Sequence, residues 1–228
     1  MNSANAIEPG HMLSMAPLAD GQPFVHTGLD AAAAAANAAP TAPVLPIDLQ
    51  AGLALDHALA RAIGARLAPD YCFAEPFPHI VLENFLPEEV ARVALDHFPR
   101  ENLKSDRVFD IGYAGQHKRQ ILPAECDAEA RALFHFFNSQ PMLAFLEGLT
   151  AIQGLIPDPY FMGGGYHETG RGGKLGIHAD FRVNEQLHLH RRLNVIVYLN
   201  EHWDETYGGN LELWSRDMAE KRHEIAPL

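Results

Sequence analysis

Basic residues and cysteines are scarce in this chain of 228 residues. Lys and Arg number 17 against 29 Asp and Glu, which gives a formal net charge of -12. A surface of this sign repels phosphate groups, so we expect neither nucleic acid nor an anionic membrane as a partner. Cys72 and Cys126 are far apart and form no Cys-x-x-Cys motif. They therefore indicate neither a disulfide framework nor a thiolate zinc site.

Targeting and membrane segments are also missing from the pattern. The first 60 residues contain no Lys and no Arg. A secretory signal begins with a basic segment and an organellar transit peptide is rich in Arg, so the sequence favours neither. No apolar run reaches the length of about 20 residues that a transmembrane helix needs. These absences predict a cytoplasmic protein.

The chain divides into three predicted regions. Residues 1–46 are rich in Ala and Pro and predict a flexible tail without chemistry. Residues 47–157 carry apolar residues at helical spacing, which predicts a helical N-terminal support region. We expect one short strand at 78–85 and helices from Leu49 to Pro69, at 87–97, at 127–138 and at 141–152.

The third region, residues 158–228, changes to short strand-like segments separated by Gly clusters. Strands in series, with helices upstream, predict a mainly β fold of the sandwich or jelly-roll type with flanking helices. We expect strands near 160–167, 174–179, 192–199, 210–215 and 222–226, with Gly-rich connections at 170–173 and 208–209.

The tripeptide His178-Ala179-Asp180 is the most informative motif. Residues two apart on a strand project from the same face, so His178 and Asp180 can supply two of the three ligands of a non-haem Fe(II) site. The pattern is common by chance, and His202-Trp203-Asp204 repeats it in a polar loop where a solvated turn is expected. The first copy differs because it follows a Gly-rich hairpin and precedes the strand-like run 192–200. This context predicts a metal site.

Four segments surround and include this motif: Tyr166–Asp180, His190–Asn194, Tyr198–Asn200 and Tyr207–Trp214. Their arrangement resembles the Fe(II)/2-oxoglutarate-dependent oxygenases, specifically the prolyl-4-hydroxylase-like branch. The resemblance covers about residues 78–228 and is most specific between 160 and 215. It implies that residues 158–228 form a double-stranded β-helix, a relative of the jelly roll and the cupins.

The resemblance also implies a ligand set. His178 and Asp180 would bind Fe(II), with 2-oxoglutarate as cosubstrate and ascorbate as an optional further cofactor. Tyr166 would reach the 2-oxoglutarate. Asn194, Ile196 and Tyr198 share one face by the period of two and would line the barrel interior, with Tyr198 binding the distal carboxylate. The alternative for these three residues is an ordinary core strand.

The implied activity is hydroxylation of a C–H bond in an amino-acid, peptidyl or other small-molecule substrate, coupled to conversion of 2-oxoglutarate to succinate and CO2. Relatives supply a distal His on a later strand and a basic residue, usually Arg, shortly after it. Neither is assignable here, so we expect a C-terminally truncated or degenerate relative, with an incomplete barrel and weak or no oxygenase activity.

Two other classes stay open. One is a non-catalytic jelly-roll binding module that kept part of the metal site. The other is a cupin-like isomerase or epimerase, which would need more barrel-facing His and Glu residues than this chain offers. The sequence indicates no oligomeric state and does not select a substrate.

Overall fold

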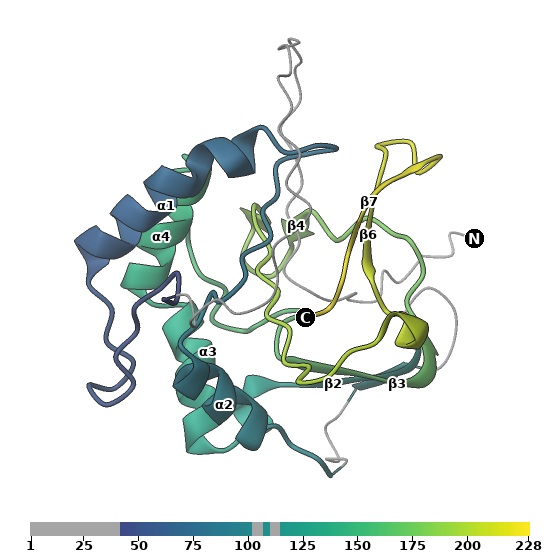
Figure 1. The fold of residues 1–228 in the computed structure, drawn as a ribbon, viewed down its shortest axis with the longest axis horizontal. Coiled ribbons are helices and arrows are strands. Elements are labelled where there is room, and N and C mark those ends of the chain that lie inside the picture. Colours follow the sequence, from purple (N-terminus) through teal and green to yellow (C-terminus); the bar gives the residue numbers. More distant parts are fainter. Residues whose placement is uncertain (1–41, 102–106, 110–114) are drawn as a thin grey trace.

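In the part of the chain that the computed structural model describes, four α-helices gather on one side and small antiparallel sheets on the other (Figure 1). The structure describes residues 42–101, 107–109 and 115–228. The helices are α1 (His57–Cys72), α2 (Glu88–Asp96), α3 (Ala128–Phe137) and α4 (Gln140–Thr150), with short 3-10 turns at η2 (Pro123–Glu125) and η3 (Glu205–Tyr207).

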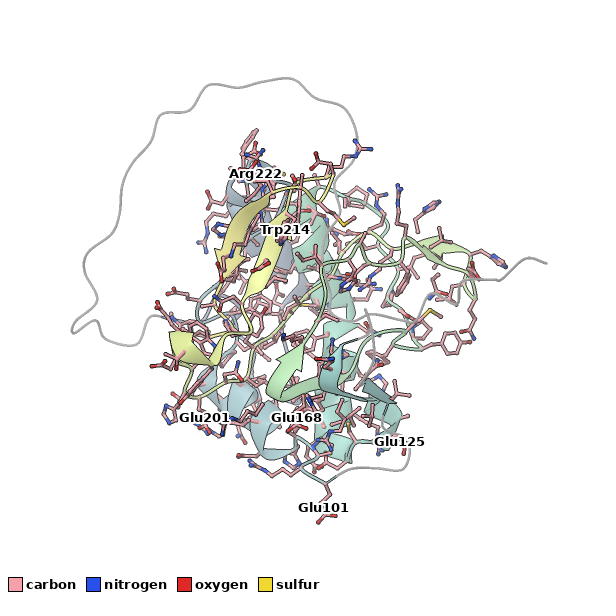
Figure 2. All side chains as sticks on the ribbon, turned by 90° about the vertical axis from the view of Figure 1, so that its right-hand side faces the viewer. Glu101, Glu125, Glu168, Glu201, Trp214 and Arg222 are labelled. Atoms are coloured by element: carbon pink, nitrogen blue, oxygen red, sulfur yellow. The ribbon has the colours of Figure 1, made fainter. Side chains whose placement is uncertain are left out.

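The strands of the described residues form three separate antiparallel sheets. The largest has the order β1-β2-β3 and contains β1 (Arg107–Phe109), β2 (Gln116–Ile121) and β3 (Tyr166–Lys174). The other two sheets are the pairs β4 (Val183–Asn184) with β5 (Leu189–His190), and β6 (Leu211–Trp214) with β7 (Lys221–Ile225). Figure 2 shows Trp214 and Arg222 of the β6–β7 pair at one end of the molecule and Glu101 at the other.

The helices after residue 86 occur where the sequence predicts them, but α1 begins and ends later than expected. It begins at His57 because Asp56 Oδ1 accepts the N–H of Leu59 at 2.7 Å, which caps the first turn. The preceding residues form a loop closed by the bridge between Asp48 and Ala54. Pro69 lies inside the last turn, where it removes one helical hydrogen bond without ending the helix.

Most of the buried apolar side chains belong to the helices and to the segment before them. Residues 1–41 of the predicted tail lie outside the described part of the chain, whereas Leu45 is fully buried and its N–H donates to the carbonyl of Phe85 at 3.1 Å. Leu193 and Val195 pack against the same core from the C-terminal part of the chain. The helical core therefore positions residues on both sides of Asn194.

The strand predictions are correct only in part. β6 and β7 lie where they are expected. The expected strands at 78–85 and 192–199 have no ladder partners among the described residues, and of the expected strand at 174–179 only Lys174 is paired, as the last residue of β3. The expected Gly-rich connection at 170–173 lies inside β3, where four residues bulge out of the ladder between the pairs Thr169–Lys118 and Lys174–Gln116. The described residues form no closed barrel, so the structure does not show a double-stranded β-helix.

Among the helices of the described residues, none is both long enough and apolar enough to span a membrane.

Helices α1 and α4 touch along their backbones because each presents a glycine to the other. A Cβ atom on Gly64 would overlap the carbonyl oxygen of Phe145, and one on Gly148 would overlap that of Arg61. Both glycines lie in helix interiors, where Ala is normally the more stable residue by about 1 kcal/mol. The close contact must therefore outweigh this helix preference.

We predict that Gly64→Ala and Gly148→Ala each lower the free energy of unfolding by roughly 2 kcal/mol, because the added methyl groups force the helices apart. Chemical denaturation monitored by circular dichroism measures this change. Gly170→Ala is the matched control, since a Cβ there meets its nearest atom, His117 O, at an ordinary 3.5 Å. Unchanged stability in both helix variants would show that the helices are not in backbone contact.

Candidate metal site

His178 lies in the extended segment between β3 and β4, with 27% of its side chain exposed. Its Nδ1 atom is 2.6 Å from the carbonyl oxygen of Gly176. A carbonyl oxygen can only accept, so Nδ1 carries a proton and donates it to this bond. In the neutral ring this leaves the lone pair on Nε2, which is the atom available to a metal ion.

The two carboxylate oxygens of Asp180 have different neighbours. Oδ1 lies 3.4 Å from His178 Nε2. Oδ2 accepts a hydrogen bond from Asn194 Nδ2 at 2.6 Å and lies 3.6 Å from a guanidinium nitrogen of Arg191. One oxygen is thus held by buried polar groups while the other faces the imidazole.

Asn194 connects Asp180 to Arg191. The Asn194 side chain is buried, with 4% of the residue exposed, and its Oδ1 accepts from Arg191 Nε at 2.7 Å. The Arg191 guanidinium lies over the ring of Phe181, 4.3 Å from its centroid. Asn194 faces Asp180 because its neighbours Leu193 and Val195 point into the helical core.

The geometry of the His178–Asp180 pair suits a shared divalent cation. Two ligand atoms that are each about 2.1 Å from one ion, at right angles, lie roughly 3 Å apart, and Nε2 and Oδ1 are 3.4 Å apart. The outer atoms of both groups are hydrogen-bonded to Gly176 and Asn194, as the outer atoms of metal ligands commonly are. The residues present therefore fit two positions of an iron site.

A third protein ligand does not join this pair among the described residues. The three-residue grouping of His and carboxylate ligands that they contain lies elsewhere, at His97, Asp127 and Glu129. There Asp127 caps α3 through the N–H of Ala130, and its other oxygen contacts His97 Nδ1 at 2.6 Å. These contacts account for the cluster without a metal.

The pKa of His178 is raised, chiefly by its hydrogen bond with Asp180 and against the effect of burial. Lys118 on β2 acts on the same pair: it interacts electrostatically with Asp180 and opposes the rise in the His178 pKa. Only 2% of Lys118 is exposed. Burial lowers its pKa from the ordinary 10.5 to about 8, against the attraction of Asp180. The sequence did not point to this residue. β2, from Gln116 to Ile121, is mostly polar, and its amino-acid pattern does not predict that Lys118 is buried.

Tyr166 packs in a small apolar cluster between the sheet and the helices. The ladder between β2 and β3 places Tyr166 opposite Ile121, and both belong to a buried cluster with Cys126 and Ala130. The Tyr166 hydroxyl donates to the carbonyl of Ala94 in α2 at 2.7 Å. In this structure the phenol therefore packs against the helices. The contact of Tyr166 with 2-oxoglutarate stays a prediction.

Tyr198 is half-buried, and burial raises the pKa of its phenol to about 12. The hydroxyl therefore stays protonated at neutral pH and can donate a hydrogen bond. No hydrogen bond among the described residues joins Tyr198 to His178 or Asp180. Its role in binding the distal carboxylate also stays a prediction.

The second His-x-Asp copy forms an exposed turn. Asp204 Oδ1 accepts the N–H of Thr206 at 2.9 Å and caps η3, while His202 is exposed.

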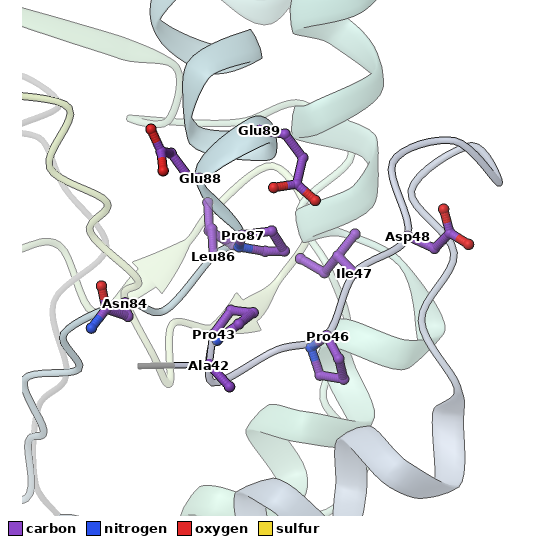
Figure 3. Close-up of a pocket in the computed structure, with 10 residues that line it drawn as sticks. All are labelled: Ala42, Pro43, Pro46, Ile47, Asp48, Asn84, Leu86, Pro87, Glu88 and Glu89. Atoms are coloured by element: carbon purple, nitrogen blue, oxygen red, sulfur yellow. The ribbon is translucent and has the colours of Figure 1, made fainter. Parts of the chain in front are cut away.

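A separate surface pocket, shown in Figure 3, lies between residues 42–48 and the start of α2 and contains neither His178 nor Asp180. The His178–Asp180 pair thus lies outside this pocket, in contact with Asn194 of the 191–200 segment.

Comparison with known families agrees with the location of this site. Residues 164–228 match the family model of the 2OG-Fe(II) oxygenase superfamily. The match covers less than a third of the chain and includes His178, Asp180 and Asn194. No curated protein and no solved structure matches the chain. The family match supports a dioxygenase of this superfamily and implies Fe(II) and 2-oxoglutarate.

We predict that Asn194→Ala weakens divalent-metal binding about 10- to 100-fold, because Asp180 loses the hydrogen bond that orients its carboxylate. Anaerobic calorimetric titration with Fe(II) measures the affinity. Asn184→Ala is the control, since Asn184 is also buried but accepts its hydrogen bond from the N–H of Leu187. Equal affinities in the two variants would mean that Asn194 does not orient Asp180.

We also predict that Lys118→Met stabilises the metal-free fold at pH 7. The native pKa of about 8 lies below the ordinary 10.5, so the native state disfavours the charged form by about 3 kcal/mol below pH 8. Between pH 8 and 10.5 the wild type gains stability relative to the variant as Lys118 loses its proton. Denaturation curves at pH 7 and pH 10 measure the difference, with the exposed Lys174→Met as control. A constant difference would contradict the burial effect.

Proposed function

We propose that this protein is an Fe(II)- and 2-oxoglutarate-dependent dioxygenase that hydroxylates a C–H bond of an amino-acid, peptidyl or other small-molecule substrate. The observation that carries the proposal is the orientation of His178 Nε2 and Asp180 Oδ1 toward each other inside the region that matches the family. The arrangement of motifs supports the narrower proposal of the prolyl-4-hydroxylase-like branch, with residues 158–228 as part of a double-stranded β-helix.

The bound cofactors would supply the oxidising chemistry, in which one oxygen atom enters the substrate C–H bond and the other enters succinate as CO2 leaves 2-oxoglutarate. The chain supplies placement. His178 and Asp180 would hold the metal through Nε2 and Oδ1. The Gly176 carbonyl keeps the imidazole in the tautomer that exposes Nε2, and Asn194 keeps one carboxylate oxygen turned away.

Charge also suits this function. Arg191 lies 3.6 Å from Asp180 Oδ2 and places a positive charge beside the carboxylate that would bind the metal. The neutral phenol of Tyr198 can donate to a carboxylate without adding charge. The family match does not favour a non-catalytic binding module or a cupin-like isomerase.

The duplicated His-x-Asp pattern provides an internal control for the metal assignment. We predict that His178→Ala and Asp180→Ala each weaken Fe(II) binding at least about tenfold, because each removes one ligand. His202→Ala and Asp204→Ala make the same chemical changes in the exposed turn and should leave the affinity unchanged. Anaerobic titration measures all four variants. Unchanged affinity in the first two would refute the assignment.

Oxygenase turnover is tested separately, by succinate release from 2-oxoglutarate in the presence of free amino acids and short peptides. Succinate formed by the wild type but not by Asp180→Ala supports the dioxygenase. Metal binding without any succinate above that of Asp180→Ala would favour a binding module instead.

A further inference from the structure

Two histidines outside the candidate metal site, His79 and His223, are in contact although they come from distant parts of the chain. Their ring centroids are 5.4 Å apart and the ring planes are tilted by 46°. Paired aromatic rings usually stack with an offset or meet edge to face, and this tilt is neither. Neutral imidazole is also the commonest metal ligand among side chains. The pair therefore has the chemistry of a metal site.

The burial pattern of the chain turns His79 away from the helical core. Ile80 and Leu82 pack against that core, whereas Val81 between them is 54% exposed. This alternation places His79 and Val81 on the opposite side of the segment. His79 is thus free to meet β7 through its ring, while its neighbours in sequence are held by the helices.

A backbone contact fixes the tautomer of His79. Its Nδ1 atom lies 2.8 Å from the carbonyl oxygen of Phe77. A carbonyl oxygen only accepts, so Nδ1 carries the proton, and the neutral ring keeps its lone pair on Nε2 for a metal ion. The same contact, also two residues apart in the chain, orients His178. His79 is therefore prepared for metal binding in the same way as His178.

His223 is the middle residue of β7 and is exposed. It pairs across the ladder with Leu213 of β6, so the two side chains share a face of the hairpin. Glu212 and Glu224 pair with each other on the opposite face, where both bind Lys221. The carboxylates of the hairpin are thus held away from His223, whose imidazole faces His79.

The separation of the two rings suits one shared ion. A metal ion about 2.1 Å from one nitrogen of each ring lies about 3.2 Å from each ring centre, so two imidazoles on a tetrahedral ion have centres about 5 Å apart. The observed 5.4 Å is close to this value. Among the described residues no third His, Cys or carboxylate ligand joins the pair. Two positions of the ion would be open to water.

We propose that His79 and His223 bind one Zn(II) ion, or a similar transition-metal ion that prefers imidazole. The site is separate from the His178–Asp180 pair and does not depend on the proposed function. A two-stranded hairpin is marginally stable alone. Its C-terminal end is held by Asn200, whose Nδ2 donates to the carbonyl of Pro227 at 2.6 Å. The ion would join the middle of the hairpin to the segment that packs on the helical core.

Calorimetric titration with Zn(II) alone tests this site. The His178–Asp180 pair could take up the same ion, so every protein in the test carries Asp180→Ala. His79→Asn keeps an amide N–H near the position of Nδ1, which can still donate to the Phe77 carbonyl, but it has no counterpart of Nε2. We expect His79→Asn and His223→Asn each to weaken Zn(II) binding at least about tenfold, because each removes one of two ligands.

The double variant should lose little more than either single variant, since two ligands of one ion act together. His202→Asn makes the same change at an exposed histidine and should leave the affinity unchanged. Zn(II) should also raise the melting temperature of the parent protein and of His202→Asn, but not that of His79→Asn or His223→Asn. Circular dichroism without metal shows which variants are folded.

Three results would overturn the shared site: no Zn(II) binding by the parent, unchanged affinity in both single variants, or a loss in only one of two folded single variants. Because His223 is exposed, His223→Asn decides the question alone where His79→Asn does not fold. Neither iron nor 2-oxoglutarate enters these measurements. The Zn(II) site and the proposed oxygenase function can therefore fail separately.

Discussion

The hydrogen bond between Asn194 Nδ2 and Asp180 Oδ2, 2.6 Å long, is the contact on which the candidate site depends. It joins the His178-Ala179-Asp180 segment, which belongs to no strand, to a residue fixed by the core. A carboxylate that is held at one oxygen can present the other in a constant direction. Together with the guanidinium of Arg191, 3.6 Å from the same oxygen, this contact holds Asp180 beside His178.

The helices reach the site through this same residue. Leu193 and Val195 pack into the core formed largely by α1 and α4, and the alternation of the extended chain turns Asn194 the other way. An exposed ion pair joins Arg92 of α2 to Glu201, the residue that follows the 191–200 segment. Helix packing and the geometry of the His178–Asp180 pair are thus linked through the 191–200 segment, although no strand ladder among the described residues includes that segment.

The sequence could predict the parts of the site that depend on near neighbours. His178 and Asp180 were predicted from a spacing of two, and Asn194 from its place in an alternating run. The contact between Asn194 and Asp180 was not predicted, because it joins residues 14 apart in the chain through a loop of unknown path. The alternation at 192–199 reports burial on two faces, and it does not reveal whether the backbone pairs with another strand.

Contacts between distant segments explain the remaining differences. The face of β3 on which Tyr166 lies depends on its register with β2, and a shift of one residue would reverse it. Lys118 lies 60 residues before His178 in the sequence, in a polar stretch with an ordinary surface composition. The Gly-rich run at 170–173 predicts a turn, but β2 extends past it and converts it into a bulge. Helix ends depended on caps, such as Asp56, more than on the apolar pattern.

The central claim is that one metal ion binds between His178 Nε2 and Asp180 Oδ1. Anomalous diffraction at the iron edge, from crystals grown anaerobically with Fe(II), tests it most directly because it locates the ion without reference to activity. The account predicts an iron peak within bonding distance of both atoms, about 2.1 Å. A peak at His97, Asp127 and Glu129 with none at the pair, or no ordered iron at all, would contradict it.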